Sequence, residues 1–305
     1  LKTMRDSGHD VDCFEMSDTI GGHWNHDYDA LHLITSRQVT GFEGFPMPED
    51  WPLFPHRNQM LEYFHLFADA FDLKSYITFN TGVTSVEPLA TDGPVGSAGW
   101  AVTTTDGLRR EYDGVLVANG HLRDQKWPHI PGEFTGKQIH SGSYRNTADI
   151  EGKRVLVIGS GNSGCDVAVD AAQGHFDTHI VIRRGHHFQP KTFFGKPRSE
   201  LGWMQEFSFE EQDLLSRLMR VAIGEASDYP GMPIPDHRAL ADGPPVVNDL
   251  LLYWVQHGRI TVRPGIERFQ GKTVYFEDGS SSEFDTILWA TGFHASLPFI
   301  DSDLL

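Results

Sequence analysis

Apolar and polar positions change period several times along the chain, and these changes predict a mixture of helices and strands. In residues 57–71 the apolar positions recur at helical spacing, which predicts an amphipathic helix. Residues 208–222 show a similar stripe, and Ser208 with Glu211 forms a capping box at its start. The stripe comprises Leu214, Leu215, Leu218 and Val221. We expect it to face the core, and a role in substrate access or at a membrane surface is the alternative.

Short apolar runs between turns predict the strands. Buried strands are expected at 11–14, 113–121, 154–158, 179–184 and 285–292, with further strands in 259–264 and 273–278. The runs 77–86, 100–105 and 109–111 predict a small antiparallel layer. The proline-rich stretch 45–55 is expected to be irregular. This order of elements predicts an α/β protein with two nucleotide-binding units in succession.

One predicted strand leads into a glycine-rich turn with the sequence GSGNSG. Gly159, Gly161 and Gly164 fit the spacing G-x-G-x-x-G between an expected strand and an expected helix. The first glycine permits a tight turn, the second lets the backbone approach a pyrophosphate, and the third lets helix and strand pack closely. Backbone N–H groups at the helix start then face the phosphates. We expect a dinucleotide site here, and an ordinary glycine-rich turn is the alternative.

The end of the following strand indicates which dinucleotide binds. NAD sites usually carry an acidic residue there, whereas this chain has Arg183 and Arg184, with Lys191 further along. A guanidinium group suits a 2′-phosphate, so NADPH is favoured over NADH. A solvated basic edge is the alternative.

The first unit begins without the elements that normally open such a domain. Glu15 follows a short predicted strand, where an acidic residue would hold an adenosine ribose. The strand and glycine loop that should precede it are expected upstream of Leu1. We therefore expect a second dinucleotide domain, for FAD, that is truncated at its start.

Charge and composition exclude several classes of partner. Asp and Glu outnumber Lys and Arg by 42 to 25, which gives a net charge of −17. Such a surface repels phosphate backbones, so no nucleic acid partner is expected. No apolar run approaches the roughly 20 residues of a transmembrane helix. Cys13 and Cys165 are distant in sequence, which favours a reduced, cytoplasmic compartment over a disulfide framework. The sequence is compatible with a homodimer and does not require one.

Several motifs together identify a family. The run FTGKQIHSGSY fits F-x-G-x-x-x-H-x-x-x-[YF] at Phe134, Gly136, His140 and Tyr144. Together with IGGHW, FPMPEDWP, GSGNSG and ATGF in this order, it resembles the fingerprint of the flavin-containing monooxygenases over essentially the whole chain. The sister Baeyer–Villiger enzymes have Trp at the position of Tyr144, so the resemblance is to the branch that oxygenates nitrogen and sulfur. Taken alone, Phe134 and Tyr144 would be core aromatics and His140 a solvated linker residue.

The resemblance implies two Rossmann-like domains, with the NADP domain inserted into the FAD domain. We expect an FAD-binding domain with linker in 1–145, an NADP-binding domain with a helical insertion in 146–286, and the return into the FAD domain in 287–305. The implied activity is that NADPH reduces FAD, dioxygen forms a hydroperoxy-flavin, and one oxygen atom passes to a soft nitrogen or sulfur nucleophile on a small molecule. No acid–base pair is needed, because the flavin carries the chemistry.

The resemblance also assigns cofactor contacts by match to the family's motifs. Those implied for FAD are Glu15, Gly22, His23, Trp24, Thr35, Val83 and Ala118. Those implied for NADP are Gly159, Gly161, Asn162, Ser163, Gly164, Arg183 and Arg184. Ile34 stands where the family often has a flavin-facing Asn, so Ile34 and Thr35 are the candidate flavin-facing positions. No catalytic side chain is assigned, and no histidine pair has the spacing of metal ligands.

Two other functions stay open. The missing first strand is compatible with a non-catalytic NADP-binding remnant. The substitution at Ile34 is compatible with an uncoupled flavin-dependent NADPH oxidase or reductase, which would release hydrogen peroxide.

Overall fold

The structure is a computed structural model that describes residues 1–90, 93–193, 195–202, 206–221, 223–224, 226–236 and 245–304. It consists of two compact units, each built from separate stretches of the chain. Unit 1 comprises Leu1–Asn25, Asn58–Asp124 and Phe293–Leu305. Unit 2 comprises His26–Arg57 and Gln125–Gly292.

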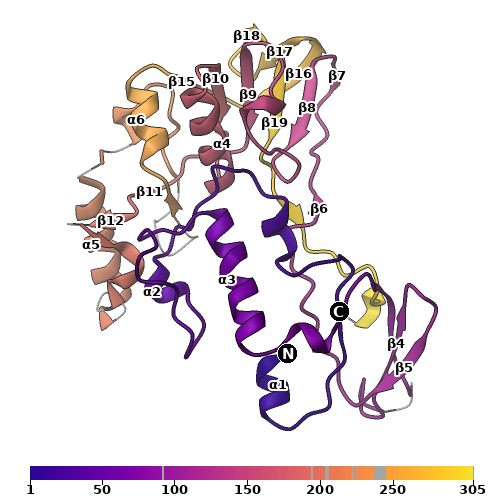
Figure 1. The fold of residues 1–305 in the computed structure, drawn as a ribbon. Coiled ribbons are helices and arrows are strands. Elements are labelled where there is room, and N and C mark those ends of the chain that lie inside the picture. Colours follow the sequence, from indigo (N-terminus) through magenta and orange to yellow (C-terminus); the bar gives the residue numbers. More distant parts are fainter. Residues whose placement is uncertain are drawn as a thin grey trace. The chain divides into compact units, whose positions relative to one another are not determined.

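A five-stranded sheet forms the centre of unit 2 (Figure 1). Its order is β15 (Ile260–Arg263), β10 (Asp177–Val181), β9 (Arg154–Ile158), β19 (Thr286–Trp289) and β8 (Lys137–His140). All neighbouring strands in it are parallel. The inner strands β9 and β19 are nearly all apolar, because a parallel sheet of this kind is covered on both faces.

The two faces of this sheet have different covers. Val155 and Val157 of β9 pack in one core with the helices α4 (Asn162–Gln173) and α6 (Leu250–Gln256). Leu156 and Ile158 point to the other face and pack in a second core with a four-stranded sheet. That sheet has the order β18 (Ser281–Glu283), β17 (Thr273–Phe276), β16 (Ile266–Gly271) and β7 (Gly132–Phe134). Because side chains alternate along β9, this strand packs against both covers, and the helices, the five-stranded sheet and the four-stranded sheet form three layers.

Short elements complete unit 2. β11 (Phe188–Gln189) pairs with β14 (Val246–Val247), and β12 (Thr192–Phe193) pairs with β13 (Lys196–Pro197). The remaining helical elements are α2 (Arg37–Thr40), η3 (Thr147–Asp149), η4 (Arg198–Glu200), α5 (Phe209–Val221) and η6 (Ala226–Asp228). The predicted capping box of α5 is present: the Ser208 N–H donates to Glu211 Oε2 at 2.8 Å, and the Glu211 N–H donates to Ser208 Oγ at 3.3 Å.

Unit 1 combines helices with a small antiparallel sheet. Its elements are α1 (Lys2–Asp6), β1 (Cys13–Phe14), η1 (Gly22–Asn25), α3 (Arg57–Ala70), η2 (Lys74–Tyr76), β2 (Ile77–Thr78), β3 (Val83–Pro88), β4 (Trp100–Thr104), β5 (Arg109–Tyr112) and η7 (Ser302–Leu304). β3, β4 and β5 are antiparallel, which confirms the predicted layer. The end of the chain returns to this unit, since the Val86 N–H donates to Phe299 O at 2.7 Å. The short strands β6 (Asp124–Gln125) and β20 (Phe293–His294) lie where the chain passes between the units.

The predicted strand at 113–121 is wrong. These residues form no strand, and Leu116 is 74% exposed. A strand needs a partner for its N–H and C=O groups, and no described strand pairs with this run. Apolar composition alone therefore predicted a strand at a place where the described residues offer no partner.

The predicted strand at 285–292 is present as β19. It lies between β9 and β8 in unit 2, and the chain passes to unit 1 at Phe293. Sequence spacing does not give the pairing partner of a strand, and the expected domain boundaries stay a prediction. Which unit holds which cofactor stays a prediction.

The stripe on α5 does not face a core where its side chains are described. Leu214 is 58% exposed and Leu218 is 59% exposed. The side chains of Leu215 and Val221 lie outside the described residues, as does Ala222. Helical spacing predicted the helix correctly, but it does not show what covers the helix.

Candidate functional site

The glycine-rich turn of unit 2 leads from β9 into α4, and each of its glycines meets a different constraint. Gly159 has φ +112°, and a Cβ there would lie 2.2 Å from Ala290 O. A Cβ on Gly164 would lie 2.1 Å from Gly159 O. A Cβ on Gly161 would have no heavy atom within 4 Å. Two glycines therefore close the turn, and the third leaves open space at the helix start, as a bound pyrophosphate requires.

The first turn of α4 offers donors to a ligand. Gly161 is the N-cap residue and brings no side chain to the helix end, where the first N–H groups lack partners within the helix. The Asn162 side chain is held at its oxygen, since Oδ1 accepts from the Val247 N–H at 3.0 Å, and its Nδ2 group still has N–H donors to offer. Ser163 lies in the same turn and is exposed. Backbone N–H groups are thus the first candidate contacts for phosphate, and the Asn162 amide can add to them.

His186 is a neighbour of the turn that the sequence did not reveal. Its Nε2 is hydrogen-bonded to Ser160 Oγ at 2.8 Å, and Ser160 is the second residue of the GSGNSG turn. The two residues are 26 positions apart, and no motif links them. In the sequence, only the adjacent histidines His186 and His187 draw attention to this position. Such a pair suggests a metal site rather than support for a turn.

Arg183 and Arg184 follow β10 directly and are exposed. They lie at the carboxyl end of a parallel strand, which is where a dinucleotide's ribose is bound in this kind of fold. Lys191 belongs to a different environment. It is half-buried, and its Nζ contacts His32 Nε2. The basic group predicted here therefore consists of two arginines rather than three cations.

Ile34 and Thr35 lie in the stretch of unit 2 that precedes α2, and both are half-buried. The two hydroxyl groups of Thr35 and Thr40 are 2.7 Å apart, and Thr40 donates to Ser36 O at 2.9 Å. Since the Thr40 proton is used there, Thr35 must donate to Thr40. The Thr35 hydroxyl proton is thus committed inside the segment, and Ile34 brings no donor.

The FAD contacts implied by the resemblance, Thr35 apart, lie in unit 1. Glu15 follows β1, and its Oε1 accepts from both the N–H and the hydroxyl of Ser17 at 2.8 Å. Gly22 has φ +53° and opens η1, which carries His23 and Trp24. The rings of His23 and Trp24 are 5.1 Å apart. Val83 begins β3, whereas Ala118 lies in the exposed run that forms no strand. The structure brings the residues from Gly22 to Trp24 together in one turn, and the cofactor roles stay predictions.

The residues of the F-x-G-x-x-x-H-x-x-x-Y run are buried in unit 2. Phe134 and Tyr144 are 5% and 0% exposed, as core aromatics would be. His140 is 1% exposed, so the alternative of a solvated linker residue is wrong. Its Nδ1 accepts from the Gly142 N–H at 3.1 Å, so Nε2 carries the proton and donates to Gly292 O at 3.1 Å. Burial lowers the pKa of this imidazole, in agreement with the neutral form.

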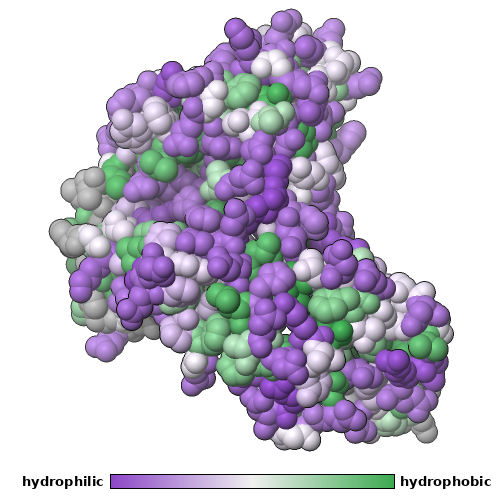
Figure 2. Space-filling model, viewed as in Figure 1, coloured by the Kyte–Doolittle hydropathy of each residue, from purple (hydrophilic) through white to green (hydrophobic). Residues whose placement is uncertain are grey.

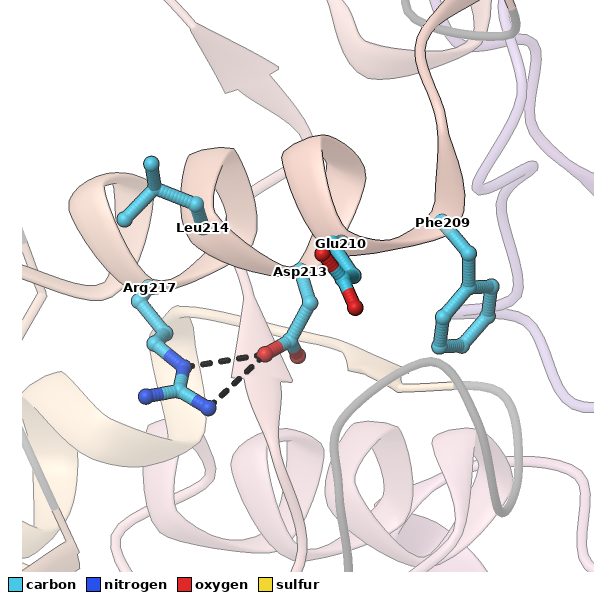
Figure 3. Close-up of a pocket in the computed structure, with 5 residues that line it drawn as sticks. All are labelled: Phe209, Glu210, Asp213, Leu214 and Arg217. Carbon is cyan, nitrogen blue, oxygen red and sulfur yellow. Dashed lines mark hydrogen bonds and ion pairs between the residues drawn. The ribbon is translucent and has the colours of Figure 1, made fainter.

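A hollow of about 300 Å³ lies along α5, lined by Phe209, Glu210, Asp213, Leu214 and Arg217. Figure 3 shows Leu214 pointing away from Asp213 and Arg217, which form an ion pair with an N–O distance of 2.9 Å. None of the predicted cofactor contacts lines this hollow. Its two carboxylates also disfavour a phosphate, so it is not the candidate coenzyme site.

Comparison with known proteins identifies the family. The model of the family described as flavin-binding monooxygenase-like matches residues 1–305. The chain belongs to this family. It is 32% identical over 331 residues to flavin-containing monooxygenase 5 from Homo sapiens and 31% identical over 328 residues to dimethylaniline monooxygenase [N-oxide-forming] 2 from Oryctolagus cuniculus. All of this chain is covered in both matches, and it spans 61% of the length of each relative.

Solved structures of flavin monooxygenases share the fold. A flavin-containing monooxygenase from Stenotrophomonas maltophilia matches with a TM-score of 0.72 at 21% identity, covering 98% of this chain and 76% of that one. A cyclohexanone monooxygenase in its open form matches with a TM-score of 0.73 at 20% identity, covering 96% and 70%. An oxidized steroid monooxygenase bound to NADP has a TM-score of 0.72 at 20% identity, covering 96% and 68%. The predicted α/β class with two Rossmann-like domains is confirmed, and the family supports FAD and NADPH as cofactors.

Surface and composition add three findings. The face in Figure 2 is mainly hydrophilic, in line with the 22% of charged residues. Among the described helices, none is long and apolar enough to cross a bilayer. In the described part of the chain, no three His, Cys, Asp or Glu residues are grouped so that they could hold a metal ion.

Proposed function

We propose that this chain forms the NADPH- and FAD-binding part of a flavoprotein monooxygenase that oxygenates a soft nitrogen or sulfur nucleophile on a small molecule. One observation carries the proposal. At the glycine-rich turn, Gly159 and Gly164 leave no room for a Cβ, whereas the space beside Gly161 is open. Packing explains the glycines at the two closed positions, whereas a glycine at the open position is what the close approach of a ligand to the backbone needs. Membership of the flavin-binding monooxygenase family supports it.

The residues of this chain would bind and orient the coenzyme. The first N–H groups of α4 would hold the pyrophosphate, and Arg183 and Arg184 would bind the 2′-phosphate. A bound flavin would supply the redox chemistry, with NADPH as the reductant and dioxygen as the source of the transferred oxygen atom. Tyr144, at the position where Baeyer–Villiger enzymes have Trp, supports a nitrogen or sulfur nucleophile rather than a ketone.

A specific observation favours partial uncoupling as the second candidate function. Ile34 has no donor, and the Thr35 hydroxyl already donates to Thr40. A developing negative charge at this segment would therefore lack a side-chain donor from either residue. NADPH oxidase activity, with release of hydrogen peroxide, would accompany oxygenation.

Both cysteines are free thiols, which supports a reduced, cytoplasmic compartment as the place of this activity. A homodimer stays a prediction.

The test uses the native-length protein with NADPH, dioxygen and a thioether or a tertiary amine. We expect sulfoxide or N-oxide as the product, with hydrogen peroxide accounting for the rest of the NADPH consumed. NADH in place of NADPH is the control. Conversion of ketones to esters with no sulfoxide or N-oxide would contradict the proposed branch. Absence of any NADPH consumption by the flavin-loaded protein would favour the non-catalytic remnant.

A further inference from the structure

A buried polar cluster in unit 2 joins α4 to the stretch that carries Ile34 and Thr35. Asp166 lies in α4, two residues after Gly164 of the glycine-rich turn, and is 9% exposed. Its Oδ2 accepts from the Tyr28 hydroxyl at 3.1 Å, and its Oδ1 accepts from Asn248 Nδ2 at 2.8 Å. The Tyr28 side chain is 4% exposed, so the bond that joins positions 138 residues apart is shielded from water.

The orientation of this cluster is fixed from a second side. Asn248 Oδ1 accepts from the Leu251 N–H at 2.9 Å, in the first turn of α6. The amide of Asn248 therefore cannot turn over without losing that bond, and its Nδ2 must face Asp166. Tyr28 supplies the remaining donor to the carboxylate. Both oxygens of Asp166 thus have a defined partner, and only Tyr28 comes from the segment before α2.

The segment is also tied to the residues between β11 and η4. The Ser36 N–H donates to Ser199 Oγ at 3.0 Å, in η4, and His32 contacts Lys191. Burial raises the pKa of Asp166 and lowers that of Lys191, and the positive charge of Lys191 opposes the shift of Asp166.

Of these contacts only those of Tyr28 lead to the helix that begins at the coenzyme turn, since its hydroxyl donates to Asp166 and is also hydrogen-bonded to Ser163 in the first turn of α4. A second, longer route to the segment runs through Asp29, whose N–H donates to Arg145 O at 2.8 Å.

We propose that Tyr28 is a positioning residue, which through its hydrogen bond to Asp166 makes the ordering of Ile34 and Thr35 depend on coenzyme bound at the glycine-rich turn. The inference rests on the proposed function, because it takes NADP to bind at that turn. A ligand that orders the first turn of α4 fixes Asp166, and Asp166 in turn fixes the Tyr28 hydroxyl. The two sites are then coupled, and such coupling requires a measured interaction rather than proximity alone.

The matched control is a second tyrosine on the same helix. The Tyr144 hydroxyl donates to Asp170 Oδ2 at 2.6 Å, one helical turn beyond Asp166, and Tyr144 is fully buried. Tyr144→Phe thus removes a bond of the same chemistry from α4. The Tyr144 hydroxyl does not itself reach the segment before α2, but the next residue does, since Arg145 O accepts from the Asp29 N–H at 2.8 Å, so this variant tests the longer route. Asp166→Asn is the conservative variant. Its amide can donate to the Tyr28 oxygen and accept from Asn248, so the connection survives while the charge is lost.

The experiment measures hydrogen–deuterium exchange of the native-length protein with and without saturating NADP⁺. In the unmodified chain we expect NADP⁺ to slow exchange at least threefold both in residues 159–168 and in residues 28–36. Tyr28→Phe should keep the protection at 159–168 and lose most of that at 28–36. Tyr144→Phe and Asp166→Asn should keep both, although thermal unfolding should show Tyr144→Phe to be destabilised about as much as Tyr28→Phe.

The outcomes separate this inference from the proposed function. If the unmodified chain binds NADP⁺ without protection at 28–36, the inference is overturned and the coenzyme site stands. Protection at 28–36 that survives in Tyr28→Phe, or that disappears equally in Tyr144→Phe, also overturns it. If NADP⁺ does not bind the unmodified chain at all, the proposed coenzyme site fails and the inference fails with it.

Discussion

Two side chains just beyond β10 are expected to decide which coenzyme the protein prefers. Arg183 and Arg184 are exposed and can each give charge-assisted hydrogen bonds to a 2′-phosphate, worth roughly 1.5–3 kcal/mol apiece. Replacing both by Ala should weaken NADPH binding by about 100-fold or more and NADH binding little. Calorimetric titration with both coenzymes checks this, with Arg268→Ala, in another sheet, as the control. Equal loss for the two coenzymes would show that the arginines do not bind the phosphate.

The side chain at position 34 is expected to control how long the oxygenated flavin survives. Ile34 has no donor, and the Thr35 proton is committed to Thr40, whereas an Asn side chain would add two N–H donors. A donor at a developing charge is typically worth about 3 kcal/mol, or about a hundredfold in rate. In the native-length protein, Ile34→Asn should therefore reduce hydrogen peroxide release per NADPH. Stopped-flow absorbance after mixing the reduced protein with dioxygen measures the lifetime. A shorter lifetime in the variant would refute this role.

Within the turn that joins β9 to α4, two glycines of the same motif should respond differently to the same substitution. Gly164→Ala places a Cβ 2.1 Å from Gly159 O, so it should destabilise unit 2 by about 1–3 kcal/mol. Gly161→Ala meets no heavy atom within 4 Å, so the fold should be kept while coenzyme binding weakens at least tenfold. Thermal unfolding and NADPH titration of both variants separate the effects. Wild-type affinity in Gly161→Ala would show that the open space beside it is not the phosphate site.

At this scale the sequence predicts elements better than their surroundings. The strand β9, the glycine-rich turn and α5 with its capping box follow from local patterns, because spacing and turn chemistry are properties of neighbouring residues. The place of β19 between β9 and β8 does not, because pairing joins residues more than a hundred positions apart. The exposure of Leu214 is a similar case, since an amphipathic spacing shows a face but not its partner.

The candidate site shows the same limit. The turn at Gly159 and Gly164 could be predicted because the motif specifies both residue type and spacing, and the place of the arginines followed from the strand before them; their roles toward a coenzyme stay predictions. The contact between His186 and Ser160 could not, because no spacing rule relates a residue after β10 to the middle of the turn. Nor could the commitment of the Thr35 hydroxyl to Thr40, which depends on how one short segment folds back on itself. Residue types within a local motif were predictable, whereas the hydrogen-bond partners of their side chains were not.

For the molecule as a whole, acid should destabilise the fold. Burial lowers the pKa of His179 from 6.5 to about 4, and its Nδ1 accepts from Arg263 Nε at 3.1 Å, so the ring is neutral in the folded state. The unfolded chain binds this proton more readily, hence stability is fully present above about pH 6.5 and is lost as pH falls toward 4. The upper limit of the loss is about 3 kcal/mol at 1.36 kcal/mol per pKa unit.

Thermal unfolding between pH 7.5 and 4.5 measures this, with His179→Gln as the comparison. Its amide can accept from Arg263 and donate to Asp177, whose Oδ1 lies 3.2 Å from His179 Nε2, without titrating. The midpoint of the variant should fall less steeply with acid. Protonation of Asp285 should destabilise the fold only at lower pH, because the N–H groups of Lys153 and Arg154 hold the pKa of its carboxyl at about 2. An identical pH profile for the variant and the unmodified chain would exclude His179 as the cause.

The order in which the strands are synthesised has a consequence for how the nascent chain folds. β19 is an inner strand of the sheet in unit 2, yet it is the last of the five to leave the ribosome. Until β19 emerges, β8 has no strand to pair with in this sheet, and one edge of β9 is unpaired. The apolar side chains of both strands are then not fully buried. Unit 1 waits longer still, because Val86 finds its partner only at Phe299. Pairing between strands that are far apart in the sequence is slow, and the unpaired strand edges are prone to aggregation until it is complete. Ribosome-bound chains from which residue 286 has not yet emerged should therefore bind chaperones more than chains from which residue 300 has emerged.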